Sequence, residues 1–407
     1  MSHSREFDVV IWGATGFTGR LVAEYIFNKY GVNNDLKWAM AARNQVKLEE
    51  VRGLVADETV PLIIADSNDE ASLAAMTKRT KVVCTTVGPY AKYGSKLVGA
   101  CVANQTNYCD LAGEAQWISK MIDQHHEAAK ANGTKIVNSC GFDSIPSDMG
   151  VYFVQQQVKA QTGSFAKQIK MRVKAMKGGI SGGTYASMSN LMEEASKDRT
   201  ILKEMFNPYS LNPKNEQDGL DKPDLRSVIY DKTAKSWISP FVMAGINTRI
   251  VRRSHALSSF TYGKDFKYDE AILSGNGFSG RLKGIGATIP LALFALAKPN
   301  SFLKKMMDNK LPKPGEGPNP EQRENGFYNL RFYSILENGA VALGKVTGDR
   351  DPGYGSTSKM IAESAICLAK DELSDIGGIL TPATAMGDAL LTRLQDNAGL
   401  TFSFELK

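Results

Sequence analysis

The sequence predicts an α/β protein of two domains, a doubly wound parallel sheet followed by an α+β domain with a mostly antiparallel sheet. Three observations lead to this class. Strand and helix signals alternate from residue 1 to about 140, a glycine-rich turn joins the first strand to the first helix, and the alternation stops near Ser144. Close alternation of strands and helices is typical of a parallel sheet with helices on both faces.

The glycine-rich turn directly follows the first predicted strand, Phe7–Trp12, and a helical pattern begins at Arg20. This order is that of the dinucleotide-binding turn in a Rossmann-type domain. Gly13 permits the tight turn, Gly16 lets the backbone approach a pyrophosphate, and Gly19 lets the helix pack closely on the strand. The helix start adds free N–H groups that attract phosphate. The residues predicted to bind the cofactor here are Gly13, Ala14, Thr15, Gly16, Phe17, Thr18 and Gly19.

Five further strands are predicted in the first domain, which we expect to span residues 1–145. They are Leu36–Ala42, Pro61–Ala65, Lys81–Thr86, Thr106–Asp110 and Thr134–Ser139. Helices are expected at Ser95–Asn104 and Glu114–Asn132, and Gly133 is a usual helix stop. Six parallel strands fit a sheet whose ligand lies across the carboxyl ends of the strands, where the strand order reverses.

The rest of the chain mixes strand-like runs with helices. The predicted strands are Gln168–Ala175, Ser227–Tyr230, Phe327–Leu336 and Gly339–Thr347. The predicted helices are Pro146–Val158, Thr184–Lys197 and Ser356–Lys370. We expect an α+β substrate or oligomerisation domain over residues 146–354 and a helical segment over 355–407 that can return to the first domain. Residues 206–225 and 310–325 are rich in Asn, Pro, Gly and charge, and are expected to be exposed loops.

Composition narrows the function classes. The 407 residues are 43% apolar and 23% charged, as in a soluble globular protein, and the net charge of +6 includes no basic block that would bind nucleic acid. The five cysteines have no metal-type spacing and no signal peptide precedes them, so we expect a reducing, cytoplasmic location. With only four histidines, no metal site is expected.

One apolar stretch complicates this location. Residues 284–297 carry no charge, and basic residues flank them: Arg281, Lys283, Lys298, Lys304 and Lys305. The stretch is shorter than the roughly 20 residues that span a bilayer, and Pro290 is expected to interrupt it. It can be a buried helix, or an interfacial anchor or acyl-chain lining whose basic rim suits anionic lipid headgroups. A peripheral contact with a membrane or lipid surface therefore stays open.

The end of the second strand bears on the choice of cofactor. An NAD-preferring site usually places an acidic side chain there, to bond the ribose 2′-hydroxyl. This strand is followed by Arg43 instead, whose guanidinium can pair a 2′-phosphate through two hydrogen bonds, unless it stacks on adenine or faces solvent. NADP(H) is thus preferred, with NAD(H) as the alternative. Asp66, after the third strand, is expected near the adenine amino group or as the cap of the next helix.

The loop after the fourth strand lies where the nicotinamide half of the cofactor is expected. Gly88 and Pro89 allow close approach of this loop to the cofactor, and Tyr90, Lys92 and Tyr93 present donors beside it. We expect Tyr90 or Tyr93, beside Lys92, to provide the proton of the reaction.

Three more loops carry candidate residues. Asp143, after the sixth strand, comes too early in its loop to be a simple helix cap, so we expect a catalytic role. Glu114 and Asp148 are explained by helix capping, although a functional role for Glu114 stays equally open. A glycine-rich loop in the second domain could form two hairpin turns or bind a carboxylate or thioester oxygen. Its candidate substrate-binding residues are Ser181, Gly182, Gly183 and Thr184.

Six motifs together resemble the saccharopine dehydrogenase-like oxidoreductases, above all their bacterial trans-acting enoyl reductase branch. They are GATGFTG (13–19), VGPYAKYG (87–94), YCDLAGE (108–114), SCGFDSIPSD (139–148), GGISGGTYAS (178–187) and DPGYGSTSKMIAESA (351–365). The resemblance implies a dinucleotide-binding domain, a saccharopine-reductase-like second domain and reduction of a carbon–carbon double bond in polyketide-type lipid synthesis. Saccharopine reductases carry Asp-Pro-Gly where this chain has Asp143-Ser144-Ile145, so saccharopine turnover is not expected.

We therefore expect an NADP(H)-dependent oxidoreductase that reduces an enoyl or related carbonyl group of a lipid-like substrate, free or carrier-bound, and that can form a homodimer. Two alternatives remain. An imine or amino-acid-adduct reductase would need a basic pocket in the second domain, for which Arg172, Lys174 and Lys177 are candidates unless they form a solvated strand face. A non-catalytic scaffold would bind NADPH at a lipid surface without turnover.

Overall fold

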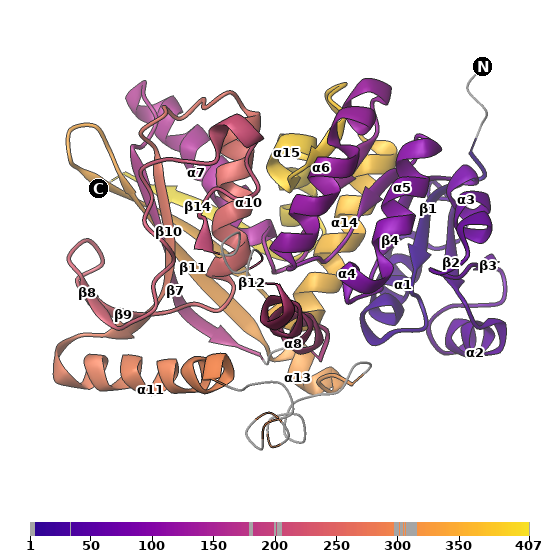
Figure 1. Ribbon diagram of the computed structural model, residues 1–407, viewed down its shortest axis with the longest axis horizontal. Coiled ribbons are helices and arrows are strands. Elements are labelled where there is room, and N and C mark those ends of the chain that lie inside the picture. Colours follow the sequence, from indigo (N-terminus) through magenta and orange to yellow (C-terminus); the bar gives the residue numbers. More distant parts are fainter. Residues whose placement is uncertain are drawn as a thin grey trace.

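The computed structural model describes residues 5–32, 34–178, 182–198, 206–296 and 316–406, together with Ile201, Ser301, Lys304 and Met306. In this part of the chain two seven-stranded sheets stand apart, with helices between them and on their outer faces (Figure 1). The predicted class is confirmed, because the first sheet is parallel and the second is mixed.

The first sheet has the strand order β13-β6-β5-β4-β1-β2-β3, and every neighbouring pair is parallel. Its strands are β1 (Phe7–Trp12), β2 (Trp38–Ala42), β3 (Leu62–Ile64), β4 (Thr80–Thr85), β5 (Asn107–Cys109), β6 (Lys135–Val137) and β13 (Gly378–Leu380). All six side chains of β1 are buried, as in a central strand covered on both faces. The order reverses between β1 and β4, so a ligand site is expected at their carboxyl ends.

Helices cover both faces of the first sheet, and local capping sets where several begin. They are α1 (Phe17–Tyr30), α2 (Gln45–Val55), α3 (Glu70–Lys78), α4 (Tyr90–Tyr93), α5 (Ser95–Ala103) and α6 (Ala115–Asn132). Asn44 caps α2 by accepting from the Lys47 N–H, and Asp69 caps α3 by accepting from the Ala71 N–H. Gly133 ends α6 in the left-handed conformation, as the sequence predicts.

The second sheet has the order β14-β12-β11-β7-β10-β9-β8, and only the β7–β10 pair is parallel among its described strands. Its strands are β7 (Gln168–Lys177), β8 (Ile229–Asp231), β9 (Ser236–Ser239), β10 (Lys267–Gly275), β11 (Phe327–Ile335), β12 (Val341–Gly348) and β14 (Leu400–Glu405). The helices α7 (Ile145–Thr162) and α10 (Ala244–Leu257) pack on one face. A Cβ on Gly150 would lie 2.3 Å from the Phe332 ring, so glycine lets α7 approach β11.

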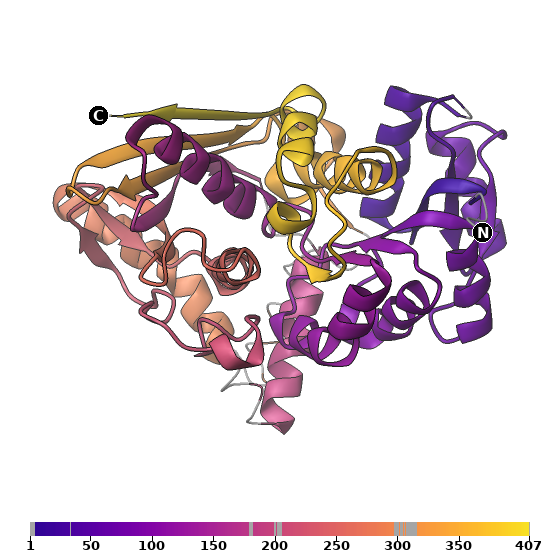
Figure 2. The same ribbon diagram turned by 90° about the horizontal axis from the view of Figure 1, so that it is seen from above.

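The C-terminal segment reaches both sheets. Its helices α14 (Thr357–Lys370) and α15 (Pro382–Asp396) lie between the sheets in both views (Figures 1 and 2). The strands that follow these helices join the two sheets separately, β13 beside β6 and β14 beside β12. The buried Glu363 of α14 accepts hydrogen bonds from the hydroxyls of Tyr25 and Tyr30 on α1, at 2.7 and 2.6 Å. Helix α14 is thus packed into the first domain, whereas β14 is part of the second sheet.

The apolar stretch forms most of α11 (Gly277–Leu296), which runs along the lower edge of the second sheet in Figure 1. The buried-helix interpretation is wrong, because Ile285, Ile289 and Leu293 are 43%, 52% and 42% exposed. Helix α11 contacts β9 and β10 through small residues: a Cβ on Gly280 would lie 2.2 Å from the Gly275 carbonyl oxygen. The bulky side chains therefore face outward. The helix also continues through Pro290, since water can satisfy the freed carbonyl on an exposed helix.

The shorter helices complete the second domain. They are α8 (Gly182–Lys197), η1 (Lys214–Glu216), α13 (Pro320–Glu324) and η2 (Pro352–Ser356). The region expected to be an exposed loop over 206–225 is largely irregular, but Leu211 is fully buried, because it packs into the core with Ile246 and Ile250. Its carbonyl accepts from the Arg253 guanidinium. None of the helices in the described ranges has the length and apolar content that crossing a bilayer requires.

Candidate active site

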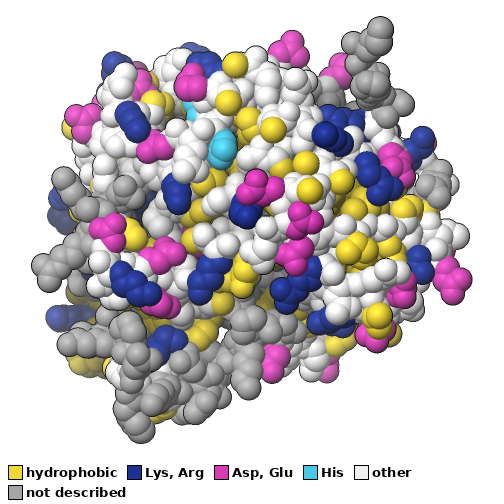
Figure 3. Space-filling model, turned by 45° about the vertical axis from the view of Figure 1, so that its right-hand side comes forward, with side chains coloured by type: hydrophobic (Ala, Val, Ile, Leu, Met, Phe, Trp, Pro, Cys, Tyr) yellow, Lys and Arg dark blue, Asp and Glu magenta, His cyan; other side chains and the backbone are white. Residues whose placement is uncertain are grey.

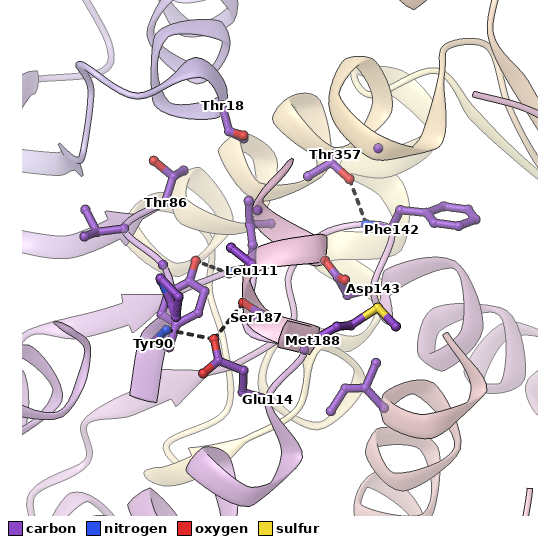
Figure 4. Close-up of a pocket in the computed structure, with 18 of the residues that line it drawn as sticks. Thr18, Thr86, Tyr90, Leu111, Glu114, Phe142, Asp143, Ser187, Met188 and Thr357 are labelled. Atoms are coloured by element: carbon purple, nitrogen blue, oxygen red, sulfur yellow. Dashed lines mark hydrogen bonds between the residues drawn. The ribbon is translucent and has the colours of Figure 1, made fainter. Parts of the chain in front are cut away.

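A cavity of about 680 Å³ opens at the carboxyl ends of β1 and β4 and extends between the two domains. The glycine turn, the loop after β4 and the loops after β5 and β6 form one wall. Helix α8, the start of α10 and η2 form the other. Figure 4 shows Ser187 and Met188 of α8 beside labelled side chains of the first wall, among them Glu114 and Asp143. This is the position at which a doubly wound sheet binds its ligand.

The glycine turn has the geometry that a pyrophosphate cradle needs. Gly13 has a φ of 91°, which favours glycine, and a Cβ there would lie 2.5 Å from Val87. A Cβ on Gly19 would lie 2.2 Å from the Gly13 carbonyl oxygen, so glycine permits α1 to pack on the turn. No side chain caps α1 at Gly16, which leaves its first N–H groups open to a phosphate. These residues fit a dinucleotide.

Only part of the predicted turn faces the cavity. Gly13, Thr15, Gly16, Phe17 and Thr18 line it, whereas Ala14 and Gly19 are buried behind it. The two buried residues shape the turn and do not offer a surface to a ligand.

Phe17 joins the turn to the second domain. Its ring meets the Tyr354 ring edge to face at 4.7 Å, and the Arg20 guanidinium lies 5.5 Å from its centre. Asp351 orders the segment that carries Tyr354, because its carboxylate accepts from the Tyr354 and Gly355 N–H groups at 3.0 and 2.8 Å. The turn before α14 therefore closes one end of the cofactor cradle.

Arg43 lies at the exposed end of β2 and lines the cavity. Its guanidinium makes no hydrogen bond or ion pair with the described residues, so it is available to a ligand. Asp66 does not line the cavity, although the adjacent Ser67 does. The carboxylate of Asp66 accepts from the Asn68 N–H, and Asp69 is the residue that caps α3.

The loop after β4 places its predicted residues in different surroundings. Gly88, Pro89, Tyr90 and Tyr93 line the cavity, whereas Lys92 is exposed and does not. The Tyr90 ring is buried; its hydroxyl donates to the Thr85 carbonyl and accepts from the Leu111 N–H, at 3.2 and 3.0 Å. Burial, followed by the charge of Asp110, raises the pKa of Tyr90 well above its usual value. This hydroxyl therefore ties together the loops after β4 and β5.

Replacing Tyr90 with phenylalanine tests that interpretation. We expect the free energy of unfolding to fall by about 1–3 kcal/mol, because the buried Leu111 N–H loses its acceptor. Turnover per folded molecule should change less than about tenfold. Urea denaturation and turnover of the variant and of Tyr230→Phe, an exposed control outside the cavity, separate the two effects. A large loss of turnover with unchanged stability would instead make Tyr90 the proton donor.

Asp143 is the cavity-lining carboxyl with the most altered acidity. Its side chain lies against the cavity in Figure 4 and makes no hydrogen bond to another described residue. Burial, and then the charge of Asp110, raise the pKa of this carboxyl to about 7 from an ordinary value of 3.8. Near neutral pH it can therefore hold or release a proton.

Two other buried acids, Asp110 and Asp148, accept hydrogen bonds that join separate segments of the chain. Asp110 accepts from the Tyr108 hydroxyl, the Asn138 amide and two backbone N–H groups, which fixes the end of β5 beside β6. Asp148 accepts from Ser254 and from the Ala383 N–H. Neither lines the cavity.

The wall from the second domain is mostly apolar. Its side chains include Met176, Met188, Leu191, Phe241, Met243 and Ile246. Arg249 is a buried cation in this wall and pairs with Asp224 at 2.8 Å. Arg172, a candidate for a carboxylate pocket, is instead buried between Asp231 and Asp269.

Of the remaining candidate residues of the second domain, some line the cavity and others do not. Lys174 and Lys177 are exposed and do not line the cavity. Gly183 lines the cavity, and Gly182 is buried behind it with its N–H donating to the Tyr354 hydroxyl at 3.0 Å. Ser181 and the side chain of Thr184 lie outside the described residues.

Sequence reasoning missed several residues of this wall. Phe241, Met243, Ile246 and Arg249 come from a segment with no recognisable motif, and no signal in a single sequence would place them here. Met188 is different, since it lies one turn after the glycines of a predicted helix and the helical period could have suggested it.

Comparisons with known proteins point to one family. A family model described as the saccharopine dehydrogenase NADP binding domain matches residues 9–137. A protein of Mycobacterium tuberculosis, provisionally named a trans-acting enoyl reductase, is 40% identical over 407 residues, covering 96% of each chain. A trans-acting enoyl reductase of Mycobacterium leprae is 36% identical over 405 residues, with the same coverage. A solved structure of Saccharomyces cerevisiae saccharopine dehydrogenase (L-Glu forming) has a TM-score of 0.54 at 13% identity, covering 98% of this chain and 99% of that one; this likeness concerns the fold alone.

Proposed function

Because the chain belongs to the saccharopine dehydrogenase-like oxidoreductases and matches their trans-acting enoyl reductases along its length, we propose that it reduces the carbon–carbon double bond of an enoyl substrate with NADP(H). The observation that carries this proposal is a single cavity in which a glycine turn with Arg43 faces an apolar wall. The glycine turn with Arg43 suits a phosphorylated dinucleotide, and the apolar wall suits an acyl chain.

The apolar wall also favours an acyl substrate over an amino-acid adduct. Arg172 is committed to two carboxylates, and Lys174 and Lys177 face solvent, so none of the three offers a carboxylate site in the cavity. The departure from Asp-Pro-Gly at residues 143–145 points the same way.

The cavity residues divide the work of the reaction. Gly13, Gly16 and the first turn of α1 hold the pyrophosphate, and Arg43 holds the 2′-phosphate. Bound NADPH supplies a hydride for the β-carbon of the substrate. Asp143 gives its proton to the α-carbon, and the resulting carboxylate regains a proton from solvent. Tyr93, at the cavity edge, is the second candidate donor.

Turnover of a short and a long trans-2-enoyl thioester, each with NADPH and with NADH, tests the function. We expect NADPH consumption with both thioesters and a lower KM for the longer chain, because more of it contacts the apolar wall. A ketone and a cyclic imine of similar size are the comparison substrates. Faster turnover of the imine would replace the enoyl assignment, and NADPH binding without turnover of any of them would favour the scaffold.

We further propose that α11 contacts a lipid surface. One apolar stripe runs along α11, and each of its residues is 42–74% exposed. These residues recur at helical spacing: Phe278, Leu282, Ile285, Ile289 and Leu293. The charged residues of α11 are cations that flank the stripe, Arg281 and Lys283. Elsewhere, on the face shown in Figure 3, described basic and acidic side chains are interspersed. An apolar stripe with a basic rim suits an anionic interface.

Flotation with vesicles tests this contact. The triple variant Leu282→Ser, Ile285→Ser, Ile289→Ser should bind vesicles containing phosphatidylglycerol at least about tenfold less than wild type, since each buried apolar side chain contributes about 1.5–3 kcal/mol. The control is Val46→Ser with Leu54→Ser, which removes similarly exposed side chains from α2. No vesicle binding by wild type, with a dimer that the triple variant disrupts, would assign the stripe to a second copy of the chain.

A further inference from the structure

A buried carboxylate connects the two walls of the cavity. Glu114 is 1% exposed and accepts three hydrogen bonds. Its Oε1 accepts from the Tyr90 N–H and the Ser187 hydroxyl, both at 2.8 Å (Figure 4). Its Oε2 accepts from the Ala91 N–H at 3.0 Å. Tyr90 and Ala91 are the first two residues of α4, the short helix in the loop after β4, whereas Ser187 belongs to α8 of the second domain.

This side chain is not the cap of its own helix. Glu114 occupies the residue before α6, but its carboxylate makes no capping bond to that helix. It reaches instead to the loop after β4. Of the two interpretations that the sequence left open, capping of α6 is therefore wrong.

Helix α8 both lines the apolar wall of the cavity and contacts Glu114. Ser187 is followed by Met188, and Leu191 lies one turn further, so the residues beside the Glu114 contact form part of the apolar wall. A second hydrogen bond also reaches α8: the Gln116 amide at the start of α6 donates to Glu194 at 3.2 Å. The position of α8 over the cavity is thus linked directly to the loop that borders the nicotinamide site.

We propose that Glu114 is a positioning residue that holds the loop Gly88–Tyr93 against the cofactor through its contact with Ser187 of α8. The proposal rests on the proposed function, because it assigns the nicotinamide half of NADP(H) to this loop. Its consequence is that the second domain affects the nicotinamide end of the cofactor site and leaves the adenine end unchanged.

Two ligands distinguish these ends without any turnover. NADPH occupies the whole site, whereas adenosine 2′,5′-bisphosphate lacks the nicotinamide half and needs only the glycine turn and Arg43. We expect Glu114→Gln to raise the Kd of NADPH about tenfold, because the amide can accept fewer of the three hydrogen bonds, and to change that of the bisphosphate less than about twofold. Calorimetric titration measures both constants.

Ser187 supplies the sharper variants. Ser187→Ala should raise the Kd of NADPH about threefold to fivefold and lower kcat, and Ser187→Thr, which keeps the hydroxyl, should restore both. The matched control is Ser189→Ala on the same helix, whose hydroxyl has no partner among the described residues. A thermal melt of each variant confirms folding.

The outcomes separate this proposal from the proposed function. Equal weakening of both ligands, or no difference between Ser187→Ala and Ser189→Ala, would overturn the positioning role. Absence of enoyl turnover by wild type, with the ligand pattern intact, would overturn the reaction and leave Glu114 as proposed. If wild type binds neither ligand, both proposals fail.

Discussion

Replacing Asp143 with asparagine is expected to lower kcat by about 10²- to 10³-fold, the usual contribution of a positioned acid or base. The substitution preserves the shape of the side chain and removes its proton. NADPH binding should change less than about threefold, because the carboxyl makes no contact with the glycine turn. Steady-state kinetics with a trans-2-enoyl thioester and a binding titration measure the two effects.

The matched control is Asp148→Asn. Asp148 is also buried, with a pKa raised by burial to about 7, but it bonds Ser254 and the Ala383 N–H and does not line the cavity. Its replacement should alter stability and leave kcat of the folded protein nearly unchanged. Similar losses of kcat in both variants would mean that the fold, and not the acid, is affected. In that case Tyr93 becomes the donor to test.

The pH dependence of Asp143 gives a second check. An acid acts in its protonated form, so kcat should fall as pH rises through about 7, and the Asp143→Asn variant should lose that step. The stability of the folded protein also depends on the protonation of Asp143. Its folded pKa lies above its ordinary value of 3.8, so the protonated form favours folding and this contribution is lost as pH rises from about 4 to about 7. The asparagine variant should therefore gain in Tm over wild type more at pH 8 than at pH 5.

The first domain was predictable from sequence because its signals are local. Strand β1 ends where the glycines begin, and the predicted Phe7–Trp12 is the observed strand. The seventh strand, β13, escaped prediction, since its three residues, Gly378–Leu380, carry no periodicity and gain their place only by pairing with β6. Pairing between distant segments leaves no trace in a single sequence.

The second domain shows where pattern reasoning stops. Helix α10 was not predicted, and it buries Arg249, Arg252 and Arg253, although arginine is usually exposed. Partners from irregular segments compensate for the loss of water around these charges. Arg252 pairs with Asp221, and Arg253 donates to the carbonyl of Leu211. Buried charges of this kind are stable only with such partners, and nothing local in the sequence announces them.

In the candidate site, too, residues placed by local sequence signals were predictable, and contacts between distant segments were not. Gly13, Gly16 and Arg43 were found because a strand, a turn and a helix fix their places by chain order alone. The partners of Glu114 and of the Tyr90 hydroxyl were not, since each bond joins loops that meet only after the sheet has formed. The sequence named Tyr90 and Tyr93 as candidates for the proton donor and Asp143 as a catalytic residue. It could not choose among them, because the burial and pKa of Asp143 and Tyr90 depend on contacts of this kind.

Replacing Arg43 with alanine is expected to raise the Kd of NADPH about 10- to 100-fold and to change that of NADH less than about twofold, because charge-assisted hydrogen bonds to phosphate contribute about 1.5–3 kcal/mol. The guanidinium is exposed at the end of β2, lines the cavity and has no partner among the described residues, so its removal leaves no buried group unpaired. Parallel fluorescence titrations with both nucleotides measure the selectivity.

The control for Arg43 is Arg20→Ala, which removes a cation of α1 beside Phe17. A general loss of positive potential acts on the pyrophosphate that both nucleotides share, so this variant should weaken NADPH and NADH equally. Arg43→Ala should weaken only the nucleotide with the 2′-phosphate, and added salt should reduce that difference, since exposed charges are screened. Equal weakening by Arg43→Ala would place the 2′-phosphate elsewhere on the cavity wall. The preference for NADP(H) would then need another cation, because no acidic side chain at the end of β2 excludes the phosphate.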